Sequence, residues 1–222
     1  MARFTKIEVL QTMKESGMVP LFYNADADVA IKTVQCLYEG GARLLEFTNR
    51  GDFAQDVYHE LARYINKNLP EMILGVGSVV DQGTAALYMQ MGANFIVTPV
   101  YREDIARVCN RRNILWSPGC GTLTEITRAE EMGCDLVKLF PGSTYGPGFI
   151  KSITAPQPWT KVMPTGGVSP TKENLKGWFS AGAYCVGMGS KLIAKKEDGS
   201  FDYDKIKTIT ADALSLIKEI RS

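Results

Sequence analysis

Lys138 is a cation in an otherwise apolar run, since residues 136–141 read Leu-Val-Lys-Leu-Phe-Pro. Such a run is typical of a strand that is fully buried in a parallel sheet. A charged amine in that environment costs several kcal/mol unless it is paired or neutralised. A desolvated lysine also loses its proton more easily, and a neutral amine can attack a carbonyl carbon to form a Schiff base. Lys138 is therefore a candidate nucleophile.

Glu46 is the second candidate for chemistry of this kind. In the apolar segment 44–48, the alternation of a strand places Leu44, Glu46 and Thr48 on one face. Forming and breaking a Schiff base requires several proton transfers, which a carboxyl group in the same cavity can relay. Arg50 would add a positive charge nearby. A plain salt bridge is the alternative for either residue alone, but Lys138 and Glu46 together favour a catalytic site.

Two glycine-rich segments predict an anion-binding pocket. Residues 164–169 read Pro-Thr-Gly-Gly-Val-Ser, and residues 187–190 read Gly-Met-Gly-Ser. Backbone N–H groups in such loops can hold a phosphate, because glycine lets the main chain approach the anion. Each segment alone is weak evidence, since glycine pairs are common in turns. Their occurrence after two consecutive predicted strands indicates a phosphate site.

The elements that must position these residues alternate along the chain. Short runs rich in Val, Ile, Leu and aromatic residues predict eight strands, at residues 19–23, 44–48, 73–77, 95–99, 115–118, 136–140, 161–164 and 184–187. Each run is followed by a loop and a helical pattern, such as the amphipathic segment 52–67. Strands that alternate with helices in this way predict a parallel sheet.

A weak internal repeat favours a closed (β/α)8 barrel over an open sheet. A glycine followed by a small residue precedes four of the predicted strands, at 41–42, 92–93, 133–134 and 182–183. Each glycine has the position of a helix C-cap. We therefore predict one barrel domain over residues 1–222, with an additional N-terminal helix at 6–16 that covers the bottom of the barrel. A last helix at 204–220 would complete the outer ring.

In such a barrel the active site lies at the carboxyl ends of the strands. Polar residues occur at or just after five of the predicted strands, and they are Glu46, Thr48, Arg50, Ser78, Thr98, Lys138 and Thr165. Pro99 and Phe140 end two of these strands. We expect all of these side chains to line one site.

Composition argues against several other functions. The net charge of +1 leaves no electrostatic footprint for nucleic acid or for an anionic membrane, and no apolar run reaches the roughly 20 residues of a membrane span. The five cysteines form no C-x-x-C pair and His59 is the only histidine, so we expect neither a zinc site nor a Ser-His triad. We expect a cytoplasmic protein that binds a small molecule and needs no metal or cofactor.

These motifs, in this order, resemble the 2-keto-3-deoxy-6-phosphogluconate (KDPG) and 4-hydroxy-2-oxoglutarate (KHG) aldolase family of class I aldolases. The segments that carry the resemblance are Val19-Pro20, Gly40-Gly41, Leu45-Glu46-Phe47-Thr48, Gly75-Val76-Gly77-Ser78-Val79, Val97-Thr98-Pro99, Pro118-Gly119, Val137-Lys138-Leu139-Phe140-Pro141-Gly142, Pro164-Thr165-Gly166-Gly167-Val168 and Val186-Gly187-Met188-Gly189-Ser190. Their combination is specific, whereas no single segment is.

The resemblance implies a (β/α)8 barrel, usually packed as a homotrimer, that reversibly cleaves a 2-keto-4-hydroxy acid into pyruvate and an aldehyde without a metal. Lys138 then matches the Schiff-base lysine, and Glu46 matches the general acid and base that works through water. Arg50 matches a ligand of the substrate carboxylate, with Ser78 and Thr165 beside it. The positions that match the phosphate end of the site are Gly166, Gly167, Gly189 and Ser190.

The resemblance further implies a 2-keto-3-deoxy-6-phospho sugar acid as substrate, with glyceraldehyde 3-phosphate as the simplest aldehyde product. Three departures leave the substrate tail open. Tyr23 stands where some relatives carry an arginine, Ser78 stands where many have threonine, and the stretch 142–147 differs between subgroups. Two other functions also stay open: a metal-independent phosphosugar isomerase or synthase on the same barrel, and a barrel that binds a phosphorylated metabolite without turnover.

Overall fold

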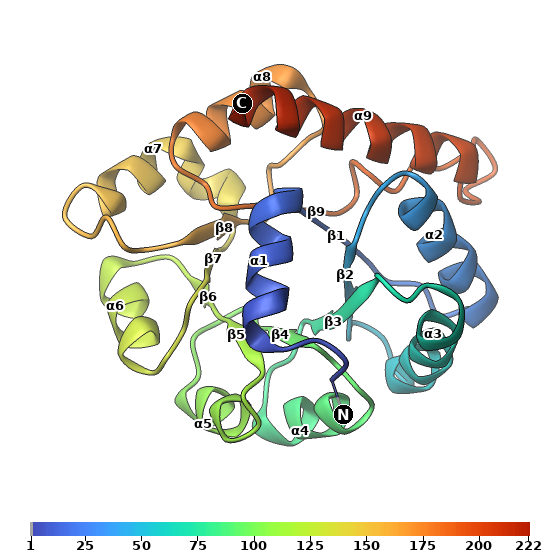
Figure 1. The fold of residues 1–222 in the computed structure, drawn as a ribbon, viewed down its shortest axis with the longest axis horizontal. Coiled ribbons are helices and arrows are strands. Elements are labelled where there is room, and N and C mark those ends of the chain that lie inside the picture. The colour runs from blue at the N-terminus through green and yellow to red at the C-terminus, as the bar shows by residue number, and fades with distance from the viewer. Residues whose placement is uncertain (1) are drawn as a thin grey trace.

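The computed structural model describes residues 2–222. A ring of helices surrounds a barrel of parallel strands, and α1 (Lys6–Ser16) lies across one end of the barrel (Figure 1). Strands and helices alternate along the chain from β1 to α9. The predicted α/β class and barrel architecture, with an additional N-terminal helix, are confirmed.

Nine strand segments within residues 2–222 form the wall of the barrel. They are β1 (Met18–Phe22), β2 (Leu44–Thr48), β3 (Ile73–Gly77), β4 (Phe95–Val97), β5 (Leu115–Ser117), β6 (Gly119–Cys120), β7 (Val137–Leu139), β8 (Val162–Pro164) and β9 (Val186–Met188). Six segments lie side by side in the order β5-β4-β3-β2-β1-β9, and three in the order β6-β7-β8. Every pairing between them is parallel.

The two groups of segments join at both of their edges. β5 and β6 are one wall strand interrupted at Pro118, which has no N–H to give to the ladder. The Pro118 carbonyl still accepts a hydrogen bond from the Lys138 N–H at 2.9 Å, so the wall continues to β7. On the other edge, Thr165 pairs with Gly187 and joins β8 to β9. The eight predicted strands therefore correspond to nine segments of one closed wall.

Eight helices of the described chain form the outer ring. They are α2 (Ala27–Glu39), α3 (Ala54–Asn68), α4 (Gln82–Gln90), α5 (Glu103–Arg111), α6 (Leu123–Glu131), α7 (Gly142–Thr154), α8 (Lys172–Ser180) and α9 (Tyr203–Arg221). The bounds of α1 are those predicted, and α9 extends the predicted helix by one residue at each end. Across residues 2–222, no helix combines the length and apolar character needed to cross a membrane.

The alternation predicted for β2 decides what faces the inside of the barrel. Leu44 belongs to an interior cluster together with Val9 and Met13 of α1, so α1 closes the bottom of the barrel as predicted. Leu45 and Phe47 point the other way and pack in the layer between the strands and the ring of helices. Glu46 shares the inward face with Leu44, one step nearer to the carboxyl end.

The four glycines of the internal repeat end α2, α4, α6 and α8 in the left-handed conformation. Their φ angles are 99°, 99°, 80° and 101° at Gly41, Gly92, Gly133 and Gly182. In each case the next residue donates its N–H to a carbonyl five positions earlier, as Ala42 does to Leu37 at 2.9 Å. This hydrogen-bond pattern is the Schellman motif, in which glycine avoids the steric cost of a positive φ.

Strand ends are less well predicted than strand positions. β2 and β3 have the predicted bounds, whereas β4 ends at Val97 instead of residue 99, and the last strand covers Val186–Met188 instead of 184–187. Tyr184 already donates its N–H to the Val162 carbonyl, but its side chain reaches Leu10 of α1. The apolar character of Tyr184 therefore reflects packing under the barrel as much as strand pairing.

Candidate active site

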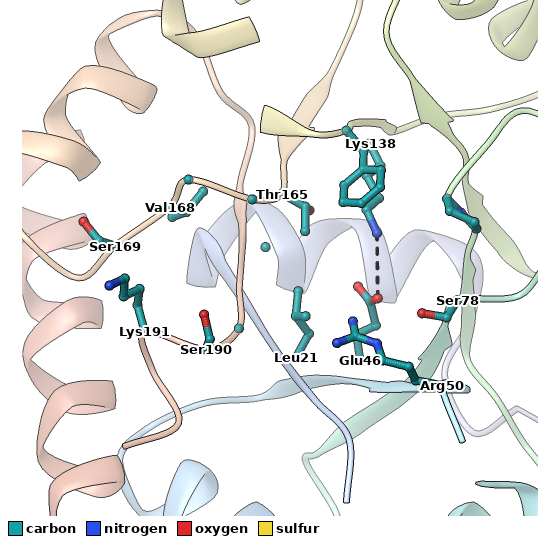
Figure 2. A pocket seen from close by; sticks show the side chains of 16 residues that line it. Leu21, Glu46, Arg50, Ser78, Lys138, Thr165, Val168, Ser169, Ser190 and Lys191 are labelled. Atoms are coloured by element: carbon teal, nitrogen blue, oxygen red, sulfur yellow. Dashed lines mark ion pairs between the residues drawn. The ribbon is translucent and has the colours of Figure 1, made fainter. Parts of the chain in front are cut away.

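A cavity of about 510 Å³ opens at the carboxyl ends of the barrel strands (Figure 2). It is lined by Leu21, Glu46, Arg50, Ser78, Pro99, Lys138, Phe140, Thr165, Gly166, Gly167, Val168, Ser169, Gly187, Gly189, Ser190 and Lys191. The volume lies in the range of small-molecule sites. Eleven of these residues were selected from the sequence pattern, so residues far apart in the chain do meet at one cavity.

Lys138 and Glu46 face each other inside this cavity. The Lys138 Nζ and Glu46 Oε1 atoms are 4.0 Å apart, and the two side chains are 7% and 1% exposed. This is an ion pair without a direct hydrogen bond. The Lys138 amine also lies 4.8 Å from the centre of the Phe140 ring, in a cation–π contact. Because the amine and the carboxylate are close but not locked together, both can engage a substrate placed between them.

Burial is the main influence on Glu46. It raises the pKa of the Glu46 carboxyl, and the positive charges of Lys138 and Arg50 offset that rise only in part. The Oε2 atom is buried and makes no hydrogen bond within residues 2–222. A carboxyl group with a raised pKa can hold a proton and return it during a reaction. Gly77 of the neighbouring β3 makes room for it, since a Cβ there would overlap Glu46 Oε1.

Arg50 and Ser78 bring a cation and a hydroxyl beside this pair. Arg50 follows β2 in a tight turn, where its N–H donates to the Thr48 carbonyl at 2.8 Å. Ser78 follows β3 with a φ of 58°, a conformation that costs a non-glycine residue about 1–2 kcal/mol. Figure 2 shows both side chains next to Glu46. A guanidinium and a hydroxyl so placed can bind a carboxylate close to the Lys138 amine.

The two glycine-rich loops form the opposite side of the cavity. Thr165 at the end of β8 is 6% exposed, and its Oγ1 has no hydrogen-bond partner in the described chain. Gly166 and Gly167 follow it, and Gly189 and Ser190 line the neighbouring loop after β9. The loops predicted to bind an anion therefore lie side by side, with a free hydroxyl between them and Lys138 (Figure 2).

Thr48 and Thr98 lie outside the cavity lining, although the sequence pattern placed them at the site. The Thr98 hydroxyl donates to the Val100 carbonyl at 2.6 Å, and the Thr48 hydroxyl to the Phe22 carbonyl at 3.4 Å. Both side chains are buried. The Thr98 hydroxyl thus satisfies a carbonyl two residues along the chain, and the Thr48 hydroxyl a carbonyl of the neighbouring β1. Strand position alone does not distinguish this use of threonine from substrate binding.

Five lining residues were not named as individual site residues, and they are Leu21, Val168, Ser169, Gly187 and Lys191. Three of them, Val168, Ser169 and Gly187, lie within the predicted glycine-rich segments. Two signals could have found some of them. Leu21 shares its strand face with Val19, which belongs to the interior cluster. Ser169 ends the first glycine-rich segment, and Lys191 directly follows the second. The position of Lys191 beside a predicted anion-binding loop is the more informative of these two signals.

Other nucleophiles and metal ligands in the described chain are poorly placed. Cys120 ends β6, but burial raises the pKa of its thiol to about 12, so the thiol stays protonated near neutral pH. All five cysteines are free and buried. Residues 2–222 contain no cluster of three or more His, Cys, Asp or Glu side chains that could hold a metal ion. Lys138 is the best placed nucleophile in the cavity.

The closed parallel barrel and its buried lysine and glutamate pair have the features of a lysine-dependent barrel enzyme. The model of the KDPG and KHG aldolase family matches residues 9–209. The chain therefore belongs to the KDPG and KHG aldolase family, and the resemblance found in its motifs is confirmed.

Individual relatives agree with this assignment. The chain is 27% identical over 216 residues to the 2-dehydro-3-deoxy-phosphogluconate aldolase of Haemophilus influenzae, covering 97% of this chain and 99% of the relative. It is 30% identical to the 2-dehydro-3-deoxy-6-phosphogalactonate aldolase of Escherichia coli, covering 82% and 87%. The solved KDPG aldolase of Legionella pneumophila superposes with a TM-score of 0.81 at 24% identity, covering 91% of this chain and 96% of that chain, which shows the shared fold.

Proposed function

We propose that the protein is a class I aldolase that reversibly cleaves a 2-keto-3-deoxy-6-phospho sugar acid into pyruvate and an aldehyde such as glyceraldehyde 3-phosphate. Membership of the family supports the reaction class. The observation that carries the proposal is the buried Lys138 amine, 4.0 Å from a Glu46 carboxylate inside a substrate-sized cavity. This arrangement suits imine chemistry, which needs an amine nucleophile and an adjacent proton relay.

Lys138 carries the covalent steps. Its neutral amine adds to the C2 ketone of the substrate, and loss of water from the resulting carbinolamine leaves a protonated imine. The imine draws in the electron pair of the C3–C4 bond when a base removes the proton of the C4 hydroxyl. The aldehyde leaves, and the remaining enamine takes a proton at C3. Water then hydrolyses the imine, so that pyruvate and the free Lys138 amine are regenerated.

Glu46 moves the protons in this sequence. As a carboxylic acid it protonates the hydroxyl that leaves the carbinolamine, and as a carboxylate it accepts the C4 hydroxyl proton through a water. Both forms must be populated during one turnover. Burial, which raises the pKa of the Glu46 carboxyl, keeps the acid form accessible, while Lys138 and Arg50 stabilise the carboxylate.

Arg50, Ser78 and Thr165 orient the reacting end of the substrate. The Arg50 guanidinium binds the C1 carboxylate, with the Ser78 hydroxyl beside it, and this fixes the C2 ketone at the Lys138 amine. The Thr165 hydroxyl has no partner in the described chain and is free to bond to the substrate carboxylate. The loops at 166–167 and 189–190 receive the phosphorylated tail.

A cleavage assay tests the reaction class directly. The protein is incubated with 2-keto-3-deoxy-6-phosphogluconate, and released pyruvate is measured with lactate dehydrogenase and NADH. We expect equal amounts of pyruvate and glyceraldehyde 3-phosphate. An isomerase or synthase would consume or rearrange the substrate without releasing pyruvate, and a binding protein would leave it unchanged. A panel that includes the galactonate analogue and 4-hydroxy-2-oxoglutarate, compared by kcat/KM, would define the substrate.

The assembly and the compartment belong to the same proposal. We expect a homotrimer, and four exposed apolar residues support a contact surface, since Phe53, Val80, Leu87 and Val100 belong to three consecutive strand and helix units. The free buried cysteines support a reducing, cytoplasmic location. Size-exclusion chromatography with light scattering measures the assembly, and a mass of one chain would contradict the trimer.

A further inference from the structure

The cavity has a free cation at the end away from Lys138. Figure 2 shows Lys191 next to Ser190 and on the same side as Ser169, with Leu21 and Thr165 between it and the catalytic pair. Lys191 makes no ion pair within residues 2–222. Among the described residues of the lining, Glu46 is the only acid, so no carboxylate competes for the Lys191 ammonium group.

Unused backbone donors lie on the same side of the cavity. The N–H groups of Gly166, Gly167 and Val168 donate to no acceptor within residues 2–222, whereas the Ser169 N–H donates to the Asn174 side chain. Neutral N–H groups bind phosphate and sulfate, but they do not neutralise the charge of a phosphate dianion. A lysine at the same place supplies that charge.

A second cavity of about 580 Å³ is the competing place for an anionic tail. It adjoins the first through Leu21, Arg50, Gly189 and Ser190, and it contains the cation Lys195. Several of its backbone donors are already occupied, however. In the described chain the N–H groups of residues 192–194 donate to backbone carbonyls of the same turn, and the Lys195 amine lies 5.8 Å from the centre of the Phe201 ring.

We propose that Lys191 is the residue by which this enzyme selects phosphorylated over unphosphorylated substrates, through an ion pair with the terminal phosphate. This rests on the proposed aldolase function. The charges in the cavity then match the substrate: Arg50 takes the carboxylate at one end, Lys191 takes the phosphate at the other, and Lys138 and Glu46 act between them. Lys191 is a specificity residue in this account and takes no part in bond cleavage.

The test compares two substrates in three proteins. The kcat/KM values are measured for 2-keto-3-deoxy-6-phosphogluconate and for unphosphorylated 2-keto-3-deoxygluconate, with the wild type, Lys191→Gln and Lys195→Gln. We expect Lys191→Gln to lose about 10- to 100-fold on the phosphorylated acid, the effect of one lost charge-assisted hydrogen bond, and much less on the unphosphorylated acid. Lys195→Gln should show a far smaller selective loss. Inorganic phosphate should inhibit the wild type competitively and Lys191→Gln more weakly.

Each other outcome overturns the proposal. Equal losses on both substrates would make Lys191 structural, no loss would remove it from the site, and a selective loss in Lys195→Gln would move the tail to the second cavity. Trapping of pyruvate with borohydride in the same proteins separates this failure from that of the aldolase function. A wild type that traps pyruvate but has no phosphate preference contradicts the role of Lys191 alone.

Discussion

The two ends of the barrel interior are made from the same strands and differ in chemistry. Under α1, the interior is filled by apolar side chains such as Met13, Leu44 and Phe95, none of them more than 1% exposed. At the other end, the interior holds Glu46 and Lys138, which are almost as deeply buried. Leu44 and Glu46 are only two residues apart on one face of β2.

Within the single strand β2, one inward residue therefore serves stability and the other serves function. Burial of Leu44 contributes favourable free energy, about 25 cal/mol for each Å² of apolar surface removed from water. Burial of Glu46 costs free energy, leaves its Oε2 atom without a hydrogen bond in the described chain and raises its pKa. Ser78 adds backbone strain at the same end. The apolar end thus contributes the stability of the barrel. The other end costs free energy but holds the groups that can do chemistry.

The largest effect is expected from Lys138. Lys138→Met removes the amine that forms the covalent intermediate, so kcat/KM should fall by about 10³-fold or more. Lys172→Met is a matched control, since Lys172 pairs with Glu219 on the surface and should lose little stability and no activity. A Lys138→Met protein that is folded by circular dichroism and retains turnover would contradict the covalent mechanism.

Glu46→Gln should lower kcat by about 10²- to 10⁴-fold, the usual contribution of a general acid and base. The amide is nearly the same size but cannot exchange a proton. Lys138 remains, so the variant should still form a Schiff base with pyruvate, although more slowly. Full turnover in this variant would transfer the proton relay to another group.

The same variant gives a stability test with a defined sign. Burial raises the pKa of the Glu46 carboxyl above its ordinary 4.5, so between 4.5 and the raised value the folded protein binds more protons than the unfolded chain. The contribution of Glu46 to the free energy of unfolding must then fall as pH rises through that window. Urea titrations should show the wild type losing stability relative to Glu46→Gln as pH increases above 4.5. A difference that is constant or of opposite sign would contradict the raised pKa.

Gly77→Ala tests the position of Glu46 without touching its chemistry. The added methyl would overlap Glu46 Oε1 and displace the carboxyl group. A displacement of about 1 Å can cost about 10²-fold in rate, and kcat should fall by that order. Gly177→Ala in α8 is the matched control, because its Cβ would meet only Pro147 at an ordinary 3.7 Å. If both variants keep wild-type kcat, the carboxyl position is not critical.

The smallest effect is expected at the apolar end. The Thr5 side chain accepts from the Glu8 N–H, and the Glu8 side chain accepts from the Thr5 N–H, so the two residues form a capping box for α1. Thr5→Ala should lower the free energy of unfolding by about 1 kcal/mol and leave kcat unchanged. Thr12→Ala, in the middle of the same helix, should cost less. A change in kcat for Thr5→Ala would show that the two ends are coupled.

Much of the fold could be predicted from sequence patterns that report local backbone geometry. The alternation Leu44, Glu46 and Thr48 assigns the inward face of β2, and the glycine at 41 and its three equivalents mark helix ends, because both patterns report backbone geometry. The interruption of one wall strand at Pro118 was not predicted. It depends on how the chain crosses from β5 to β6 in the closed wall, which the local sequence does not specify.

The sequence predicts which strand ends contribute to the site, but not which way each side chain there turns. Lys138 and Glu46 were found because a charged residue is unusual in a buried strand, and the two glycine loops because they follow two consecutive predicted strands. Thr98 lies outside the cavity lining because its hydroxyl turns to the Val100 carbonyl, and Lys191 was missed because its place after the second glycine loop is a weak signal until the loops meet. The first is a local contact that the strand pattern does not specify, and the second depends on tertiary contacts between the loops.

Reductive trapping tests the central claim most directly. The protein is incubated with pyruvate and sodium borohydride, and the intact mass and the labelled peptide are then determined by mass spectrometry. We predict the mass gain of one reduced pyruvate per chain, located at Lys138, and no gain in Lys138→Met. No gain in the wild type, or a gain that survives in Lys138→Met, would contradict the account.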